Sequence, residues 1–229
     1  MRTPVAHAAL MLIVTLGATG VAYGQDEDVV PAPRPWDGET AVRVYAQGAL
    51  GMFGDVRARS ETMRTGAAVS PSAGVAAGVE IPLAHAFSLG IEASVWSWSA
   101  TQPGMMSVSD SWLLEASFVP RFRNPWSLSS GEHFSIGLAI PVGPTLSLLH
   151  NGSQTDATAV LGARDGTGAG MHVGALVELQ AFVLPHFGFT FDVGYIHHFL
   201  WHGSAIAGQR DVQIDFGQGV VRLGVIVAI

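Results

Sequence analysis

The stretch VRLGVIVAI, residues 221–229, decides the fold class, because apolar residues alternate in it with small or polar ones. One face carries Val221, Leu223, Val225, Val227 and Ile229, and the other carries Arg222, Gly224 and Ala228. This period of two predicts a β-strand with two unlike faces. The sequence stops inside the strand, so we expect the strand to pair with the first one and to close a barrel, which leaves no open edge.

Seven further segments alternate in the same way, so the sequence predicts eight strands. The predicted strands cover residues 41–53, 72–83, 87–99, 111–123, 134–149, 170–184, 187–198 and 214–229. Pro141 and Pro144 predict an irregularity in the fifth strand, because proline has no N–H to donate to a sheet. Phe216, Gly217 and Gly219 predict a bulge early in the eighth strand.

The predicted connections alternate between short turns and longer polar or glycine-rich loops, of which residues 55–70 and 151–169 are the longest. Aromatic residues near the strand ends predict two girdles at the membrane–water interfaces. The loop-side girdle would contain Trp96, Trp98, Trp112 and Trp201, and the turn-side girdle Phe87, Trp126, Phe134 and Phe187.

The first 24 residues have the pattern of a secretory signal peptide. Arg2 supplies the positive charge, residues 8–16 the apolar core, and Ala22 and Gly24 a small-x-small cleavage site. The apolar core is too short for a membrane-spanning helix, which needs about 20 residues, although a retained anchor is the alternative. Residues 25–40 are acidic and then rich in proline, and they predict an extended periplasmic lead-in to a barrel over residues 41–229.

Composition narrows the classes of function. Only 13% of the residues are charged and the net charge is -7, which argues against nucleic-acid binding. Cysteine is absent, so the chain can form no disulfide and accept no lipid at a cysteine. A hydrophobic content of 48% suits a barrel that faces lipid with alternate residues.

The leader, the alternation, the loop pattern and the terminal strand together resemble the small eight-stranded outer-membrane β-barrels, of the OmpA membrane-domain and OmpX kind. The resemblance covers residues 41–229 and implies an all-β, closed antiparallel transmembrane barrel with long extracellular loops and short periplasmic turns. It also implies a monomer in a Gram-negative outer membrane, with lipid, lipopolysaccharide and the assembly machinery as partners. Ile229 departs from the family, whose terminal strand usually ends in phenylalanine. The alternative is a soluble secreted sandwich or lipocalin-like barrel, which would also alternate.

Charged residues recur on the face that would point into the lumen. They are Arg43, Glu80, Glu92, Glu115, Arg121, Arg123, Glu178, Asp192 and Arg222. Buried charges must pair, so we expect Arg43 to meet Glu80. We also expect Glu178, Asp192 and Arg222 to form a triad in which Arg222 reaches Asp192 first. These pairs predict a structural plug, and the alternative is a path for ions or small solutes.

Five histidines lie toward the loop side, and two of them, His172 and His198, are predicted to be inward neighbours. The others are His150, His197 and His202. Paired imidazoles can hold a transition metal. No tight metal-binding motif is present, so we expect polar rim residues and no cofactor.

One arrangement resembles an enzyme, the outer-membrane lipid A deacylases. The resemblance implies that His202 is the base, Ser204 the nucleophile and Asp215 the orienting acid. Ala205 and Phe216 depart from the family, which has asparagine and glutamate there. The expected function is therefore a structural or surface-interaction role without catalysis, with a small pore and a lipid esterase as the alternatives.

Overall fold

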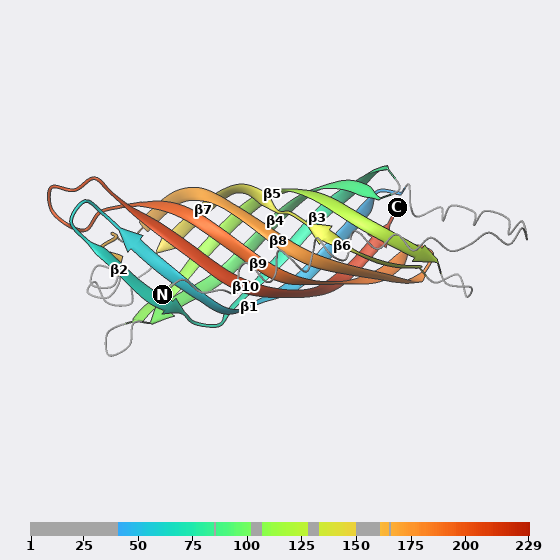
Figure 1. Ribbon diagram of the computed structural model, residues 1–229, viewed down its shortest axis with the longest axis horizontal. Helices are drawn as coiled ribbons and strands as arrows, with labels where there is room; N and C mark the ends of the chain where they lie inside the picture. Colours follow the sequence, from blue (N-terminus) through green and yellow to red (C-terminus); the bar gives the residue numbers. More distant parts are fainter. Residues whose placement is uncertain (1–40, 85, 102–106, 128–132, 150–160, 165) are drawn as a thin grey trace, which may run out of the picture. The chain divides into compact units, whose positions relative to one another are not determined.

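The structure is a computed structural model that describes residues 41–84, 86–101, 107–127, 133–149, 161–164 and 166–229 (Figure 1). The predicted signal peptide and lead-in lie outside these residues, as does His150. Within the described residues, no helix has the length and apolarity needed to cross a membrane.

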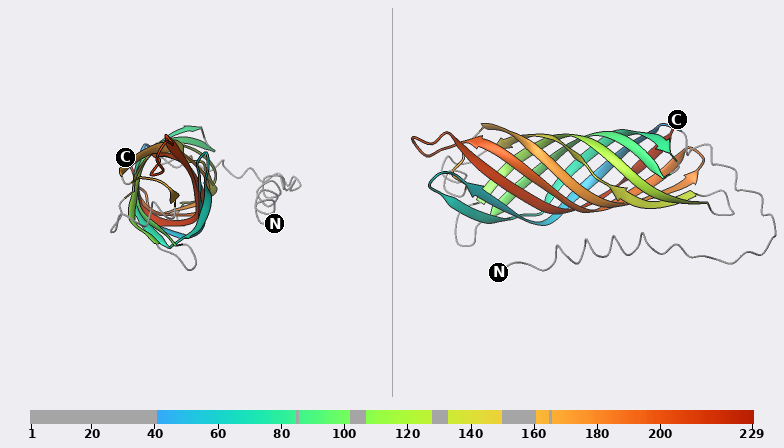
Figure 2. Two further views of the ribbon diagram at one scale, coloured as in Figure 1. Left: turned by 90° about the vertical axis from the view of Figure 1, so that its left-hand side faces the viewer. Right: turned by 45° about the horizontal axis from the view of Figure 1, so that its top comes forward.

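The described residues form ten strands. They are β1 (Arg43–Arg59), β2 (Arg64–Val69), β3 (Ser72–Ala84), β4 (Phe87–Thr101), β5 (Ser107–Ser127), β6 (His133–Ala139), β7 (Val142–Leu149), β8 (Gly166–Leu184), β9 (Phe187–Gly203) and β10 (Asp211–Ala228). All are antiparallel to their neighbours, and β1 pairs with β10, so the sheet closes on itself (Figure 2, left).

Two pairs of strands each occupy one position in the ring. β2 continues the register of β3 against β1, and β7 continues that of β6 against β5 and β8. The break between β6 and β7 falls at Pro141, where the sequence predicts an irregularity. A backbone hydrogen bond from Gly174 N to Pro141 O at 2.8 Å joins the two neighbouring strands across this break. The ring therefore has eight positions, which confirms the predicted closed eight-stranded barrel.

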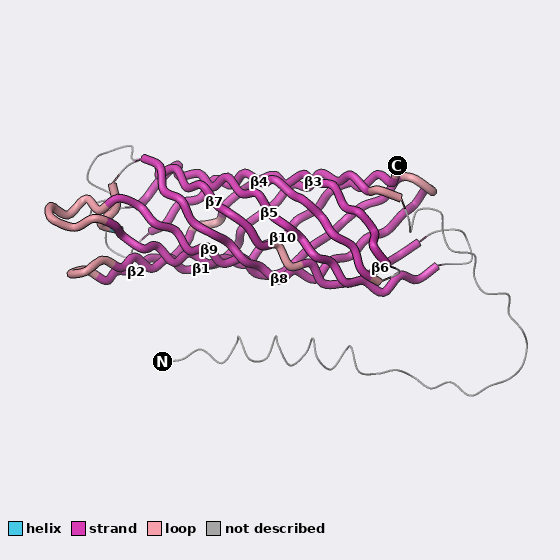
Figure 3. The backbone as a smooth tube through the Cα atoms, turned by 90° about the horizontal axis from the view of Figure 1, so that it is seen from above, coloured by secondary structure: helices cyan, strands magenta, loops and turns pink. Residues whose placement is uncertain are grey.

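The strands are strongly tilted against the barrel axis (Figure 3). The register partners around the ring are, in order, Gly48, Val75, Val95, Leu114, Leu146, Ala169, Trp201, Gln213 and Arg59. The path leaves β1 at Gly48 and, after one turn around the barrel, returns to β1 at Arg59, which is closer to the end of that strand. Residues in one row therefore lie at different heights, and contacts inside the barrel follow height rather than row.

The terminal strand has the predicted phase. Leu223, Val225 and Val227 are exposed on the outer face, whereas Arg222 is 1% exposed and points inward. The predicted bulge in β10 is wrong, because the register shift lies in β1, between Gly51 and Gly54. The ring of Phe53, within this bulge, lies over outward-facing Gly219, where a Cβ would come within 2.5 Å of it.

We call the end of the barrel that carries the β1–β2 hairpin and residues 204–210 the loop end. The other end, where Ala84 pairs with Phe87 and Leu184 with Phe187, is the turn end. The predicted loop over residues 55–70 is wrong, because β1 and β2 extend through most of it. Alternation continues there with the polarity reversed: Val56 and Val69 point inward, and Asp55 and Arg57 outward. Part of the other predicted loop, residues 166–169, belongs to β8. Strand β5 continues to Ser127, four residues beyond the predicted end of the fourth strand at residue 123.

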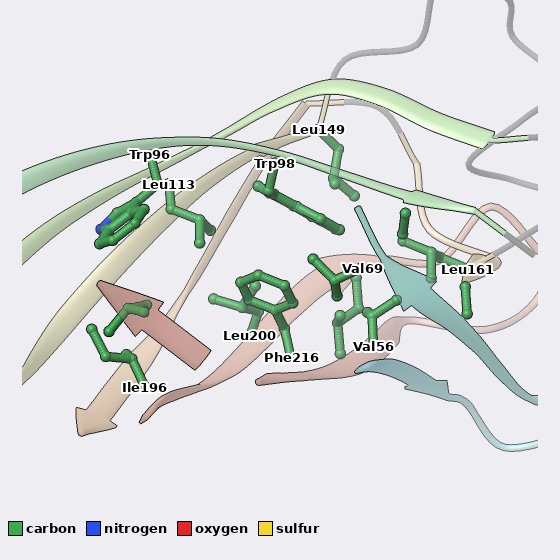
Figure 4. Packing of buried hydrophobic residues seen from close by; sticks show 14 of the residues in the cluster. Val56, Val69, Trp96, Trp98, Leu113, Leu149, Leu161, Ile196, Leu200 and Phe216 are labelled. Atoms are coloured by element: carbon green, nitrogen blue, oxygen red, sulfur yellow. The ribbon is translucent and has the colours of Figure 1, made fainter. Parts of the chain in front are cut away.

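Apolar side chains fill the loop-end part of the interior (Figure 4). They include Val56, Val69, Trp96, Trp98, Leu113, Leu149, Leu161, Ile196, Leu200 and Phe216. Trp96 and Trp98 are 0% and 2% exposed, so their assignment to a girdle is wrong; they share the inward parity of Glu92. Trp112 and Trp201 are exposed on the outer face, as a girdle requires.

Candidate functional site in the barrel interior

A cluster of five ionised residues fills the interior toward the turn end. We call Arg43, Glu80, Arg121, Arg123 and Glu178 the ion cluster. Arg43 contacts Glu80 at 3.1 Å, as predicted, and Arg121 Nε contacts Glu178 at 2.8 Å. Arg123 is paired with both Glu80 and Glu178. Since every member is nearly inaccessible to solvent, these pairs satisfy charges that would otherwise be costly to bury.

A second set of polar residues lies next to the ion cluster, nearer the loop end. Tyr45 links the two, because its hydroxyl accepts a hydrogen bond from Arg121 Nη2 at 2.7 Å and donates one to Glu92 Oε2 at 3.0 Å. Arg222 Nη1 donates to Glu92 Oε1 at 2.7 Å. Asp192, the register partner of Arg222, is also buried, so this set and the ion cluster together contain four guanidiniums and four carboxylates.

The predicted triad of Glu178, Asp192 and Arg222 is wrong as a set of ion pairs. The three residues are register partners across β8, β9 and β10. However, Glu178 pairs with the arginines of the ion cluster, Arg222 pairs with Glu92 on β4, and Asp192 accepts a hydrogen bond from Gln47 Nε2 at 2.8 Å. In a narrow, tilted barrel a long guanidinium side chain reaches another strand at its own height more readily than its register partner.

Hydrogen-bonded histidines lie above these charges. His198 Nε2 donates to Glu115 at 2.5 Å, and Glu115 also accepts bonds from Ser94 Oγ and Trp96 Nε1. The ring of His172 contacts hydroxyls of Ser117 and Thr145, each at 2.8 Å.

The two histidines are register partners with ring centroids 5.8 Å apart, as predicted for neighbours. Both nitrogens of His172 are engaged by hydroxyls, and one nitrogen of His198 by Glu115. Among the described residues, no three histidine, aspartate or glutamate side chains are grouped as metal ligands would be.

A short segment at the loop end, residues 161–164, covers the apolar interior. Leu161 and Ala163 are fully buried, and backbone bonds join Arg164 N to Gly203 O and Ala205 N to Gly162 O, both at 2.8 Å. Gly162 has a φ of 66°, which favours glycine, and lies against the terminal methyl of Met63. The segment is thus held between the β1–β2 hairpin and residues 204–210.

The residues of the possible esterase do not come together. His202 is 2% exposed and faces the interior, and its ring nitrogens have no hydrogen-bond partner within the described residues. Ser204 Oγ accepts a bond from Ile206 N, and Asp215 lies on the outer face, paired with Arg59. On β10 the even-numbered residues point inward here, so Asp215 cannot orient His202 and the triad is wrong.

Sequence reasoning selected the charged residues and overlooked the neutral ones that connect them. Tyr45, Gln47 and Gln180 all carry inward polar groups bonded to the charges. The alternation of each strand could have identified them, because Tyr45 and Gln47 follow Arg43 by two and four residues and Gln180 follows Glu178 by two, which places them on the same inward face. The ring of Tyr45 also lies 4.7 Å beneath the guanidinium of Arg121, an arrangement that favours the cation.

No protein-family model and no curated protein matches the sequence. Solved structures do resemble the fold. The outer membrane protein OprG from Pseudomonas aeruginosa is 10% identical, with a TM-score of 0.52 over 83% of this chain and 96% of its own. Neisserial surface protein A (NspA) is 16% identical, with a TM-score of 0.40 over 81% and 97% of the two chains. Ail, the attachment invasion locus protein of Yersinia pestis, in complex with the heparin analogue sucrose octasulfate, is 12% identical, with a TM-score of 0.36 over 81% and 99%.

The closed ring of eight strand positions, the exposed apolar outer face and the paired charges inside define a class, the small transmembrane β-barrels. The likeness to OprG agrees with this at the level of the fold. The chain therefore has the fold of the small eight-stranded outer-membrane β-barrels.

Proposed function

We propose that this protein is a sealed outer-membrane barrel without catalytic activity, whose structural or surface-interaction role is performed by its loop end. One observation carries the proposal: the described interior holds, from the turn end to the loop end, the ion cluster, hydrogen-bonded polar residues and the buried apolar side chains near Leu161. A solute would have to displace all three layers.

The energetics favour a plug over a pore. Separating one buried ion pair leaves an uncompensated charge, which costs about 3–5 kcal/mol. An ion that passed the ion cluster would then meet apolar side chains, where burying a charge without a partner is costlier still. The small pore is therefore the second candidate, supported by the polar residues of the lower interior but opposed by the apolar layer above them.

We infer the remaining features from the same fold. The exposed apolar outer wall requires lipid, which supports an outer-membrane location. Export with cleavage near Gly24 is the corresponding expectation from the pattern of residues 1–24. Strand closure within one chain supports a monomer, because no sheet edge is left for a second copy.

Liposome swelling tests the proposal. Folded protein, verified by heat-modifiable migration on a gel, is incorporated into liposomes that contain an impermeant sugar, and small sugars are added outside. We expect no swelling above that of protein-free liposomes, while a general porin in parallel produces rapid swelling. Swelling that rises with the amount of folded protein would favour the pore.

A further inference from the structure

A buried histidine lies next to residues 161–164, which we call the covering segment. His202 is 2% exposed and points into the barrel, and neither of its ring nitrogens has a hydrogen-bond partner in the part of the chain that the structure describes. Its ring lies over Gly168 of β8, where a Cβ would come within 2.3 Å of Nε2. The glycine therefore leaves the space that the imidazole occupies.

The surroundings of His202 are uncharged on every side. The inward residues of the adjoining elements are Leu200 and Ser204 on β9, Val212 on β10, Gly168 on β8, Ser147 on β7, and Leu161 and Ala163 in the covering segment. The charged residues that adjoin these elements in sequence, Arg164, Arg210 and Asp211, are exposed. On the inward face of β9 the next titratable group is His198, which Leu200 separates from His202.

His202 lies beyond the lipid-facing part of the barrel wall. Trp201, its neighbour on β9, is exposed on the outer face, and tryptophan rings lie at the level of the lipid headgroups. Because β9 runs toward the loop end, His202 is one residue further from the bilayer than this ring. The outward residues of β10 at this level, Asp211 and Gln213, are polar. Water therefore surrounds the part of the barrel that holds His202.

The apolar surroundings favour the neutral form of His202. Burial lowers the pKa of its imidazole from the usual 6.5 to about 4. A proton would give the ring a positive charge and two N–H donors, for which the adjoining residues supply no carboxylate. A histidine in water binds its proton at higher pH than this buried ring does. The closed arrangement therefore loses stability as the pH falls from about 6.5 toward 4.

The covering segment is fastened to the residues that directly follow His202. Two backbone hydrogen bonds of 2.8 Å and one β-bridge join residues 162–164 to residues 203–205. On its other side, Gly162 lies against the terminal methyl of Met63 in the β1–β2 hairpin, a contact without a hydrogen bond. Leu161 and Ala163 are fully buried, so water reaches the ring of His202 from the loop end when this segment moves away.

We propose that the covering segment is an acid-sensitive lid: a proton on His202 releases residues 161–164 from residues 203–205 and exposes the apolar interior of the loop end. At neutral pH the uncharged ring packs with its apolar neighbours and the lid is closed. In acid the charged ring gains water once the lid is open. The ion cluster lies toward the other end of the barrel and keeps the lumen sealed. The loop end thus has a second state, which the proposed surface role does not require.

Hydrogen exchange at two pH values tests the lid. Protein folded in neutral detergent is labelled at about pH 7.5 and at about pH 5, on either side of the usual histidine pKa, and mass spectrometry reads the amides of residues 161–164 and 203–205. Wild-type protein is compared with His202→Phe at each pH, so that the intrinsic effect of pH on exchange cancels. We expect the ratio of the wild-type rate to the variant rate to rise ~10-fold or more between the two pH values, as the pKa difference between the closed and open states allows.

Two further variants are the controls. His197→Gln removes a histidine from the outer face of the same strand and should keep the acid response of wild-type protein. His202→Leu replaces His202→Phe if the latter does not fold. An unchanged ratio at the two pH values would overturn the proposal, as would an equal loss of the response in His197→Gln. Acceleration as large in β3 as in the covering segment would mean general unfolding and would also overturn it.

A disulfide across the β-bridge tests whether the lid itself moves. The chain has no cysteine, so Ala163→Cys/Ser204→Cys can form one disulfide only, at two positions that already pair. At about pH 5, residues 161–164 should exchange more slowly in the oxidised variant than in the same variant after reduction, by ~10-fold or more. Equal rates in the two forms would mean that the acid response does not require the lid to open, which would contradict the proposal.

Discussion

At the scale of single residues, the interior is held by guanidinium–carboxylate pairs that join strands distant in the ring. Arg222 on β10 contacts Glu92 on β4, and Tyr45 on β1 joins Glu92 to Arg121 on β5. The polar contacts thus link opposite walls of the barrel. Each link can be tested by removing one partner.

Arg222 and Glu92 should behave as a pair. Arg222→Met leaves Glu92 buried without its cation and should lower the free energy of unfolding by about 3–5 kcal/mol, measured by urea titration in detergent micelles. Adding Glu92→Gln should recover part of this loss, because the orphaned charge is removed. Adding Asp192→Asn instead should recover less. A greater recovery with Asp192→Asn would mean that Arg222 pairs within its own register row.

The hydroxyl of Tyr45 should also contribute to stability. Tyr45→Phe removes one buried hydrogen-bond partner from Arg121 and one from Glu92, and it should cost about 1–3 kcal/mol. Tyr195→Phe removes the same group from an exposed tyrosine of the outer wall and serves as the matched control, with a change near zero in the same titration. Equal losses in the two variants would argue against the bridge.

At the scale of strands, the alternation persists while its polarity reverses toward the loop end. On β1, Arg43 and Gln47 point inward below the bulge, and Val56 points inward above it, with Arg57 outside. Toward the turn end, the wall has an apolar outer face that suits lipid and polar contacts inside. Toward the loop end, the outer face is polar and suits water, and the interior is an apolar core. The barrel wall therefore extends beyond the membrane.

Arginine substitutions should locate this boundary. Val225→Arg introduces a charge into the lipid-facing part of β10 and should cost about 2–4 kcal/mol. Ala68→Arg, on the outer face of β2 opposite Asp55, should change stability by less than about 0.5 kcal/mol. Gly224 is unsuitable as a control, because a Cβ there would come within 2.0 Å of Ala46 O. If both substitutions prove equally costly in urea titrations, the boundary is misplaced.

The strands, and the face that each of their residues occupies, could be predicted from the sequence, because successive side chains of a β-strand point to opposite faces. The same rule places Trp96 and Trp98 inside and Asp215 outside, whereas residue type alone predicts a girdle for the two tryptophans and a catalytic role for Asp215. Residues 55–70 were predicted as a loop because their outward residues are polar, which excludes a strand only within the membrane. The partners of Arg222 and Asp192 could not be predicted, because they depend on strand tilt and on the reach of side chains across the lumen.

At the scale of the whole molecule, the two ends of the barrel differ in the connections that they carry. At the turn end Ala84 pairs with Phe87 and Leu184 with Phe187, whereas the loop end carries the hairpin, the covering segment and residues 204–210. In the proposed orientation only the loop end faces the outside of the cell.

Tags of a few residues should report this orientation on intact cells. A tag between Glu61 and Thr62, at the tip of the β1–β2 hairpin, should be cut by added protease. A tag between Pro185 and His186 should be cut only after the outer membrane is opened, because periplasmic turns are inaccessible from outside. The opposite pattern would invert the proposed orientation.

The sealed lumen is the central claim, and the conductance of folded protein in a planar lipid bilayer tests it most directly. Because the ionic and apolar layers block the lumen in series, wild-type protein should give no discrete current steps. Trp98→Ala/Phe216→Ala, which removes two rings that pack 5.0 Å apart in the apolar layer, should also remain silent while the ion cluster is intact. Reproducible current steps from wild-type protein, absent from protein-free bilayers, would contradict the account.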